Sequence, residues 1–262
     1  MWDRTLAVLA AVCRICPLCV LRRCFPRSIY GRCMTYLERC CPFCMAYDAR
    51  MKKRAAETYG RLEERRQLFL EYGYDQARAV DYVAGFVPKG AEPLLDAGTG
   101  RGHLAVALAR GGHRLTSIDI ARDMIASARL HAAHHGVTGQ IRFLKRAAHR
   151  SGFPSEHFRA VCCMNALHHF GQSRMVLDEM VRILRPGGTF VLSDFDDEGF
   201  RILERVHALD GAVHARPGID IRAAADYLQR QYPAGLQIAT FHDAHQQVLV
   251  VTKGSPTRKE GR

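Results

Sequence analysis

The stretch "LLDAGTGRGHLAVALA", residues 94–109, decides the fold because alternating glycines join an apolar run to a helix-forming segment. Leu94 to Ala97 has the length and composition of a short buried strand. Gly102 to Arg110 has helical character, and Gly111 and Gly112 end it. Glycines between a strand and a helix let a ligand approach the backbone closely, so this loop is predicted to hold one.

The spacing of these glycines argues against a nucleotide pyrophosphate as the ligand. A dinucleotide-binding loop carries its third glycine three positions after the second, where this chain has His103. Asp96 stands two residues before the first glycine, and its charge disfavours a phosphate but favours a positive group. S-adenosylmethionine carries an ammonium and a sulfonium and no phosphate, so it is the expected cofactor. The alternative is a plain strand-to-helix turn that holds no ligand.

Strand and helix patterns alternate beyond this loop. Strands are predicted at residues 94–97, 115–119, 140–144, 160–164, 189–193, 236–241 and 247–252, and helices at 46–88, 102–110, 121–135, 173–184, 200–211 and 221–231, with a turn at 185–188. The alternation predicts an α/β fold with a mostly parallel sheet and helices on both faces. Ligands of such sheets lie beyond the carboxyl ends of the strands, near the switch in strand order. Asp119, at the end of the second strand, is therefore placed to bind two ribose hydroxyls.

Four segments in succession carry a family resemblance. "LLDAGTGRGHLAVALA", "SIDIARDMIASAR", "FRAVCCMNALHHF" and "MVRILRPGGTFVLSDF" resemble the ordered motifs of class I S-adenosylmethionine-dependent methyltransferases, close to the ubiquinone- and menaquinone-biosynthesis type. The resemblance covers about residues 90–253. It implies a Rossmann-like seven-stranded sheet with an antiparallel last strand, an S-adenosylmethionine cofactor and methyltransferase activity. The chain then divides into a Cys-rich basic segment (1–45), a helical lid (46–90), the cofactor-binding domain (91–253) and a polar tail (254–262).

The resemblance also implies a set of cofactor contacts. The glycine loop would line the methionine end, Ile120 would pack on the adenine with support from Met124, and Asn165 would face the sulfonium. The expected cofactor-binding residues are Asp96, Gly98, Thr99, Gly100, Gly102, Asp119, Ile120, Met124, Ala148 and Asn165. Two positions depart from the family pattern. Ala147 replaces the acid that meets the adenine amine, and Arg159 replaces an aspartate before the fourth strand.

Methyl transfer is an in-line displacement that mainly needs alignment and exclusion of water. A base is needed only when the nucleophile holds a proton. His168 and His169, at the end of "NALHHF", are the candidate catalytic residues, and the alternative is that they only pack or hydrogen-bond. The motifs of nucleic-acid methylases are missing, which favours a small-molecule acceptor. A second hypothesis is a non-catalytic protein that binds the cofactor and uses its Cys-rich arm for metal sensing or partner contact.

The N-terminal segment is basic and rich in cysteine. Residues 1–66 hold 14 Lys and Arg against 6 Asp and Glu, so most of the net charge of +12 lies there, and eight of the ten cysteines lie between residues 13 and 44. Cys13, Cys16, Cys19 and Cys24 come close to an iron–sulfur spacing. Two Cys-x-x-Cys pairs, Cys16 with Cys19 and Cys41 with Cys44, are instead compatible with a zinc site. The alternatives are thiols without metal, or translation that begins at Met45 or Met51.

The sequence contains no apolar run near the roughly 20 residues that span a bilayer. The short apolar stretch from Thr5 to Val12 lacks a small-residue cleavage site, which argues against a signal peptide. We therefore expect a cytoplasmic protein. An RNA methyltransferase that uses the basic N-terminus is a further hypothesis without a supporting motif, and the sequence does not indicate an oligomeric state.

Overall fold

The structure, a computed structural model, describes residues 42–254, with side chains from residue 49 onward. Two compact units divide the chain, one ending at Arg54 and the other beginning at Ala55. The fold and the site described below belong to the second unit. Five candidate metal ligands, Cys13, Cys16, Cys19, Cys24 and Cys41, lie outside the described residues, and the side chain of the sixth, Cys44, is not described. The metal hypothesis for these cysteines stays a prediction.

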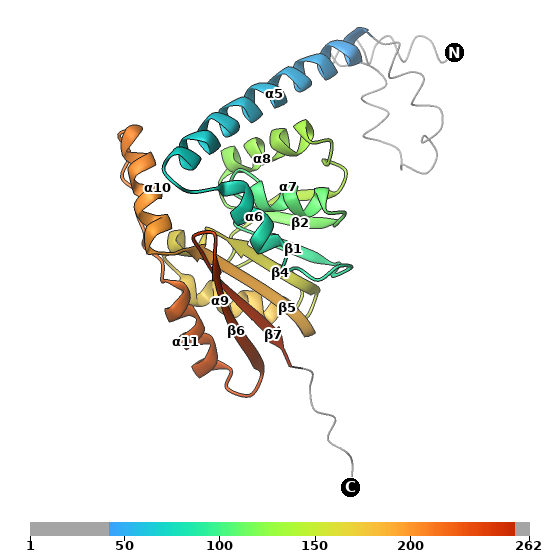
Figure 1. Cartoon of the computed structure of the whole chain (residues 1–262). Coiled ribbons are helices and arrows are strands. Elements are labelled where there is room, and N and C mark those ends of the chain that lie inside the picture. Colours follow the sequence, from blue (N-terminus) through green and yellow to red (C-terminus); the bar gives the residue numbers. More distant parts are fainter. Residues whose placement is uncertain (1–41, 255–262) are drawn as a thin grey trace, which may run out of the picture. The chain divides into compact units, whose positions relative to one another are not determined.

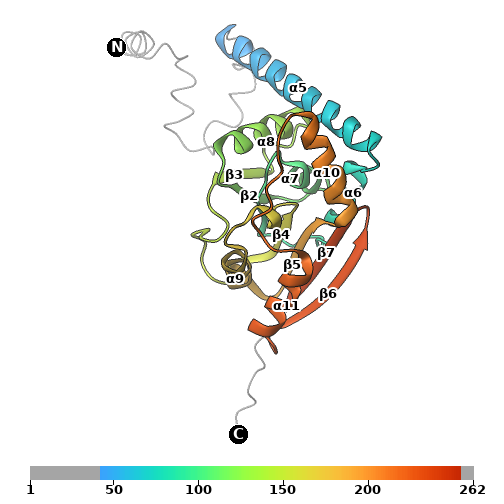
Figure 2. The same ribbon diagram turned by 90° about the vertical axis from the view of Figure 1, so that its left-hand side faces the viewer.

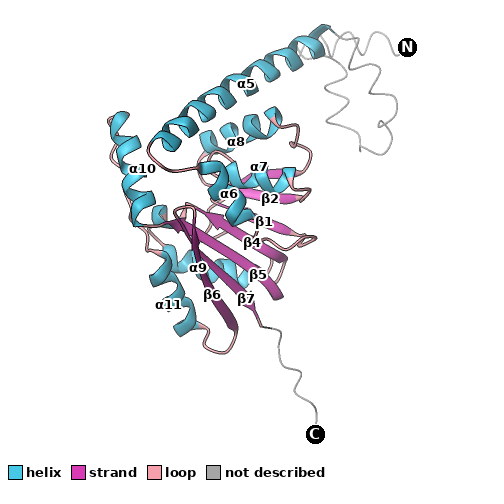
Figure 3. Ribbon diagram, in the orientation of Figure 1, coloured by secondary structure: helices cyan, strands magenta, loops and turns pink. Residues whose placement is uncertain are grey.

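A seven-stranded sheet in the order β3-β2-β1-β4-β5-β7-β6 forms the centre of the second unit (Figure 1; Figure 3). The strands are β1 (Leu94–Ala97), β2 (Leu115–Asp119), β3 (Ile141–Lys145), β4 (Phe158–Met164), β5 (Leu184–Phe195), β6 (Leu236–Asp243) and β7 (Gln246–Lys253). Strands β1 to β5 pair in parallel, and β7 runs antiparallel between β5 and β6. The expected sheet, including its antiparallel last strand, is confirmed. The strand order switches at β1 and β4, so a ligand site is expected where these two strands end.

Helices cover both faces of this sheet (Figure 2). Helices α6 (Gln76–Ala84), α7 (His103–Arg110) and α8 (Arg122–His134) pack on one face, and α9 (Ser173–Ile183) and α11 (Ile221–Gln231) pack on the other. Neighbouring strand residues serve opposite faces because side chains alternate along a strand. Cys162 joins the core under α7 and α8, and Cys163 joins the core under α9. Both thiols are buried and belong to the core.

Two further helices carry residues that reach the carboxyl edge of the sheet. Helix α5 (Pro42–Glu71) begins four residues before the predicted start, and α10 (Asp197–Leu209) begins three residues before its own. The earlier start of α10 has a local cause, since the Asp196 side chain accepts a hydrogen bond from the Gly199 amide at 2.6 Å and caps the first turn. Phe69 and Tyr74 pack with Phe195 and Phe200 in a third apolar cluster.

Two local elements differ from the sequence prediction. Residues 185–188, predicted as a turn, lie within β5 as an irregularity in its pairing with β4: Phe158 pairs with Leu184, and Ala160 pairs with Thr189. Gly187 permits this with a φ of 73°. The short 3-10 helix η1 (Leu167–His169) follows β4 and was not predicted.

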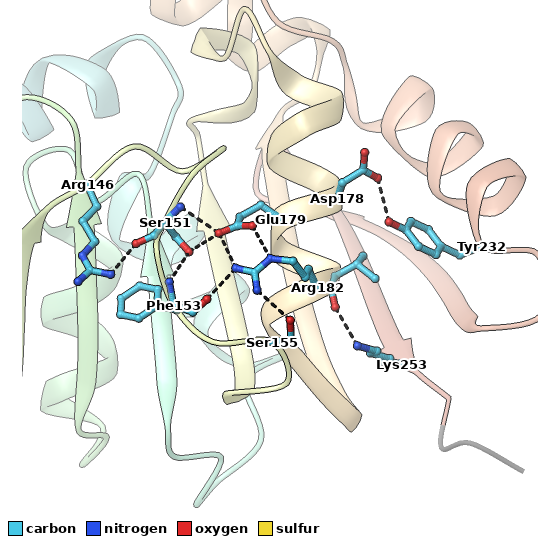
Figure 4. A network of polar contacts seen from close by, with 10 residues as sticks. Arg146, Ser151, Phe153, Ser155, Asp178, Glu179, Arg182, Tyr232 and Lys253 are labelled. Atoms are coloured by element: carbon cyan, nitrogen blue, oxygen red, sulfur yellow. Dashed lines mark hydrogen bonds and ion pairs between the residues drawn. The ribbon is translucent and has the colours of Figure 1, made fainter.

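The segment after β3 is tied to α9 by a polar network (Figure 4). The Glu179 carboxylate accepts a hydrogen bond from the Ser151 hydroxyl at 2.5 Å, and the Arg182 guanidinium donates to the Phe153 carbonyl at 2.7 Å. Arg146 donates to the Ser151 carbonyl at 2.5 Å. These bonds fix the backbone between Arg146 and Phe153, which includes the position where the family pattern places an acid.

None of the helices within residues 42–254 combines the length and the apolar character needed to span a bilayer.

Candidate active site

The glycine loop is held against the end of β2. The backbone amides of Gly98 and Thr99 donate to the Ile118 carbonyl at 2.9 and 3.0 Å. The Asp119 carboxylate accepts hydrogen bonds from the Gly100 amide at 2.8 Å and from the Ala121 amide at 2.9 Å. Asp119 therefore shapes the loop itself. A carboxylate offers about four lone-pair positions, so two remain for ligand hydroxyls.

The three glycines of the loop have different roles. A Cβ at Gly98 would lie 2.7 Å from the Ala166 methyl group, and one at Gly102 would lie 2.9 Å from that of Ala128. Both glycines permit close packing of the protein on itself. A Cβ at Gly100 would meet nothing within 4 Å, so the loop faces open space there. Only Gly100 offers the free backbone surface that the sequence predicted for all three glycines.

Asp96 is a fully buried carboxyl group at the end of β1. The Ser117 hydroxyl donates to it at 2.7 Å. Burial raises its pKa from 3.8 to about 6, and the negative charge of Asp119 adds to the shift. A carboxylate in such a position gains from a cationic ligand, because that ligand offsets its lost hydration.

A cavity of about 340 Å³ lies at the carboxyl ends of β1 and β4. Of the predicted site residues it is lined by Asp96, Gly98, Thr99, Gly100, Met124, Asn165, His168 and His169. Gly102, Asp119, Ile120 and Ala148 are not in its wall. Ile120 is 64% exposed on the residue after Asp119, which leaves an apolar surface available to a flat ring. Ala148 packs against the core beneath α9.

Several lining residues were not predicted individually. They are Leu62, Arg65 and Phe69 on α5, Tyr74 and Gln76 before or at the start of α6, and Leu203, His207 and His214 on and after α10. The predicted lid segment, residues 46–90, thus contributes to the cavity wall from Leu62 onward, and the region after β5 contributes as well. Arg65 and Asp210 form an ion pair of 2.6 Å between α5 and the end of α10. Nothing in the local sequence around His214 indicates its place in the site.

His168 is held in one orientation at the cavity wall. Its backbone amide donates to Oδ2 of Asp194 at 2.9 Å, and its Nδ1 lies 2.6 Å from Oδ1 of the same carboxylate. The side chain is 5% exposed, and its Nε2 has no partner among the described residues. His169 is the exposed member of the pair, and it makes a hydrogen bond with the backbone of Ala215.

Tyr74 and Asn165 form a second polar group in the wall. The Tyr74 hydroxyl accepts hydrogen bonds from Nδ2 of Asn165 at 3.5 Å and from Nε2 of Gln246 at 3.2 Å. Burial raises the pKa of Tyr74 well above its ordinary value, so it stays protonated. Asn165 adopts a φ of 50°, and its Oδ1 is buried with no partner in the described part of the chain. The cavity therefore presents acceptor groups to a polar ligand.

Comparison with known proteins agrees with this geometry. Residues 94–188 match the family described as a methyltransferase domain. A ubiquinone biosynthesis O-methyltransferase of Xylella fastidiosa is 34% identical over 114 residues, which are 44% of this chain and 46% of that protein. An uncharacterized methyltransferase, YcgJ of Bacillus subtilis, is 33% identical over 101 residues, 38% of this chain and 40% of that protein. The chain thus spans less than half the length of these curated relatives.

Solved structures show the same fold. An O-methyltransferase family protein from Burkholderia thailandensis superposes with a TM-score of 0.55 at 20% identity, over 68% of this chain and 56% of that one. A SAM-dependent methyltransferase from Aquifex aeolicus gives 0.50 at 14% identity, over 67% of this chain and 88% of that one. The fold and the match over residues 94–188 agree with the resemblance to class I S-adenosylmethionine-dependent methyltransferases.

Proposed function

We propose that this protein transfers a methyl group from S-adenosylmethionine to a small molecule bound in the cavity. One observation carries the proposal: the buried carboxyl of Asp96 and the open backbone at Gly100 share a cavity at the switch between β1 and β4. An acidic group beside a sterically open loop suits a cationic ligand without phosphate.

The residues around the cavity fit the cofactor. Asp96 would attract the ammonium group, the remaining lone pairs of Asp119 would accept the ribose hydroxyls, and the exposed Ile120 would cover the adenine ring. Met124 lines the same cavity. When bound, the cofactor supplies an electrophilic methyl group. No acid stands at Ala147, so adenine recognition in this proposal relies on Ile120 and on backbone groups.

The acceptor would lie on the side of the cavity formed by the histidines. His168 and His169 line it together with Asn165. The Asp194 carboxylate fixes Nδ1 of His168, so Nε2 is the free ring atom. We assign to His168 and His169 the binding of the acceptor and the removal of its proton. Arg65, Leu203 and His207 would limit the access of water, which favours displacement at the methyl carbon.

Oxygen nucleophiles are the first acceptors to test. Several curated relatives are named as O-methyltransferases of ubiquinone biosynthesis. A phenol or another hydroxyl needs a proton acceptor in the site, and histidine is the commonest one. The volume of the cavity favours a small acceptor over a macromolecule.

Calorimetry with S-adenosylmethionine, followed by a transfer assay over phenols, carboxylates and amines, tests the proposal. We expect saturable 1:1 binding and formation of S-adenosylhomocysteine with at least one acceptor class. Asp119→Asn should weaken cofactor binding at least tenfold. Asp123→Asn, at an exposed acid in the first turn of α8, is the matched control and should leave it unchanged. Binding of NAD or ATP in place of the sulfonium compound would contradict the proposal.

A further inference from the structure

Three histidines from two segments distant in sequence meet at the cavity wall. His168 and His169 belong to η1, and His214 lies in the connection between α10 and α11. One ring nitrogen of each lies within 4.8 Å of those of the other two. The ring centroids are 4.1 Å apart for His168 and His169, 5.0 Å for His168 and His214, and 4.9 Å for His169 and His214.

Two of these rings have a buried nitrogen atom without a hydrogen-bond partner in the described structure. They are Nε2 of His168, whose side chain is 5% exposed, and Nε2 of His214. A buried polar atom without a hydrogen-bond partner destabilises the folded protein. Two such atoms in one cluster point to a ligand that accepts lone pairs from both.

The ring of His168 is held on the side opposite its unpartnered nitrogen, as in metal sites, and the ring of His169 is held by a backbone contact. Metal-binding histidines usually bond their second nitrogen to a carboxylate or a backbone carbonyl, which fixes the ring and its tautomer. Asp194 holds Nδ1 of His168 at 2.6 Å. His169 makes its hydrogen bond with the backbone of Ala215, the residue after His214.

We infer that His168, His169 and His214 bind a divalent first-row transition metal ion whose open coordination positions face the cavity. Three neutral imidazoles suit zinc, cobalt, nickel or copper, and they do not suit magnesium or calcium, which prefer oxygen ligands. Three protein ligands with a free position are the arrangement of catalytic zinc sites.

The three rings need only a small adjustment to close on an ion. Metal–nitrogen distances of about 2.0–2.1 Å place tetrahedral ligand atoms roughly 3.3 Å apart. The loop that carries His214 is already fixed against η1, because the Gly218 amide donates to the His168 carbonyl at 2.9 Å. Arg216 lies over the Phe200 ring at 4.4 Å and pairs with Glu204 at 2.9 Å. Rotation of the His169 and His214 rings would supply the remaining approach to the fixed ring of His168.

The metal site also narrows the class of acceptor, and this part rests on the proposed function. A hydroxyl bound to a divalent ion loses its proton near neutral pH, as metal-bound water does. With the ion bound, Nε2 of His168 is a metal ligand and no longer accepts the proton, which passes to solvent. The ion would then hold the acceptor oxygen as its anion beside the cofactor. Metal binding itself does not depend on this role.

The test compares metal binding by four full-length proteins. Wild type, His214→Ala, His168→Ala and the control His134→Ala are stripped with a chelator and titrated with Co²⁺ and then with Zn²⁺. His134 is exposed on α8 and outside the cavity wall. Ions held by N-terminal cysteines are common to all four proteins and cancel in the difference. Circular dichroism and a cooperative thermal transition report that each variant is folded, and cofactor binding without metal is measured separately by calorimetry.

We expect wild type and His134→Ala to bind one more metal ion per protein molecule than His214→Ala and His168→Ala do. The Co²⁺ bound at this additional site should show a visible spectrum typical of nitrogen ligands. The affinity of this site for the metal ion should fall more than a hundredfold in His214→Ala and in His168→Ala. Equal stoichiometry and affinity in wild type and in a folded His214→Ala would overturn the metal site. Cofactor binding is a separate readout, so its loss in wild type would count against the proposed function alone.

Discussion

One carboxylate, Asp194, binds both the backbone and the side chain of His168. Oδ2 accepts the amide of His168 at 2.9 Å, and Oδ1 lies 2.6 Å from Nδ1 of its ring. Asp194 directly follows Ser193, the last residue of β5 that pairs with β4, so the topology of the sheet creates this contact across 26 residues of sequence. The contact directs Nε2 of His168 away from Asp194, and it gives the first prediction.

Asp194→Asn should reduce methyl transfer about 10- to 100-fold while leaving cofactor affinity nearly unchanged. The amide keeps the shape of the side chain but can donate to Nδ1, which would place the ring proton on Nε2. Metal affinity should fall by a similar factor, because it depends on the same ring orientation. Steady-state kinetics and calorimetry measure the two effects. Asp178→Asn is the control, since Asp178 accepts hydrogen bonds from Tyr227 and Tyr232 away from the cavity. Equal losses in both variants would refute a specific role of Asp194.

Much of this site could be predicted from the sequence, because the relevant signals are local. The strand that ends at Ala97, the glycine loop and Asp119 follow one another within 30 residues, and hydrophobic pattern and turn chemistry are sufficient to place them. The pair His168 and His169 is found in the same way, at the end of a predicted strand.

The remaining contacts could not be predicted because they depend on tertiary packing. His214 follows His169 by 45 residues and lies in a segment that shows no helical or strand periodicity of apolar residues. Its position is fixed by Gly218 and Arg216, whose partners lie on other elements. Asp194 did carry a signal, since an acid at the end of a strand next to β4 is expected near the ligand. The roles of Gly98 and Gly102 became clear only from their contacts with Ala166 and Ala128.

Cofactor affinity should increase as the pH rises through about 6 if Asp96 pairs with the ammonium group. Burial raises the pKa of Asp96 to about 6, so below that pH the carboxyl is neutral and the attraction is lost. Affinity should fall about tenfold per pH unit below the pKa. Calorimetry between pH 5 and 7 measures it. Asp96→Asn should bind weakly and with a flat profile. A flat profile in wild type would show that Asp96 is not the partner.

Ionisation of Asp96, which should strengthen cofactor binding, should lower the stability of the ligand-free protein. Its pKa in the folded protein, about 6, lies above the ordinary value of 3.8, so folding favours the protonated form. The stabilisation is fully present below pH 3.8 and is lost as the pH rises to about 6. Relative to Asp96→Asn, wild type should therefore lose thermal stability between pH 4 and 6, as thermal denaturation without cofactor would show.

The ion pair between Arg65 and Asp210 should affect acceptor binding more than stability. It joins α5 to the end of α10, and residues of both elements line the cavity. Arg65→Ala should raise the KM for the acceptor severalfold and leave the thermal midpoint nearly unchanged, because exposed pairs stabilise little. Added salt should reduce the difference from wild type. Arg201→Ala, which removes an exposed pair with Glu198 on α10, is the control and should leave the KM unchanged.

Gly218→Ala should separate His214 from the other two histidines without disturbing the cofactor half of the site. An added Cβ would lie 2.0 Å from the Leu167 carbonyl oxygen and 2.9 Å from Cα of His168, so the loop must move away from η1. Such overpacking costs about 1–3 kcal/mol. Because the metal ligands come from both sides of this contact, we expect metal affinity and methyl transfer to fall at least tenfold. Cofactor affinity should stay within about threefold of wild type, since the segment around Gly218, and not η1 beside Gly98, is expected to move.

Gly139→Ala provides the comparison for this variant, since a Cβ there meets nothing within 4 Å. It should match wild type in metal binding, transfer and thermal midpoint. Metal titration of the two variants measures binding at the histidine cluster, steady-state kinetics measures methyl transfer, and calorimetry measures cofactor binding. If Gly218→Ala lost cofactor binding together with metal binding, the contact would support the whole cavity. If it lost neither, the position of His214 would not depend on Gly218.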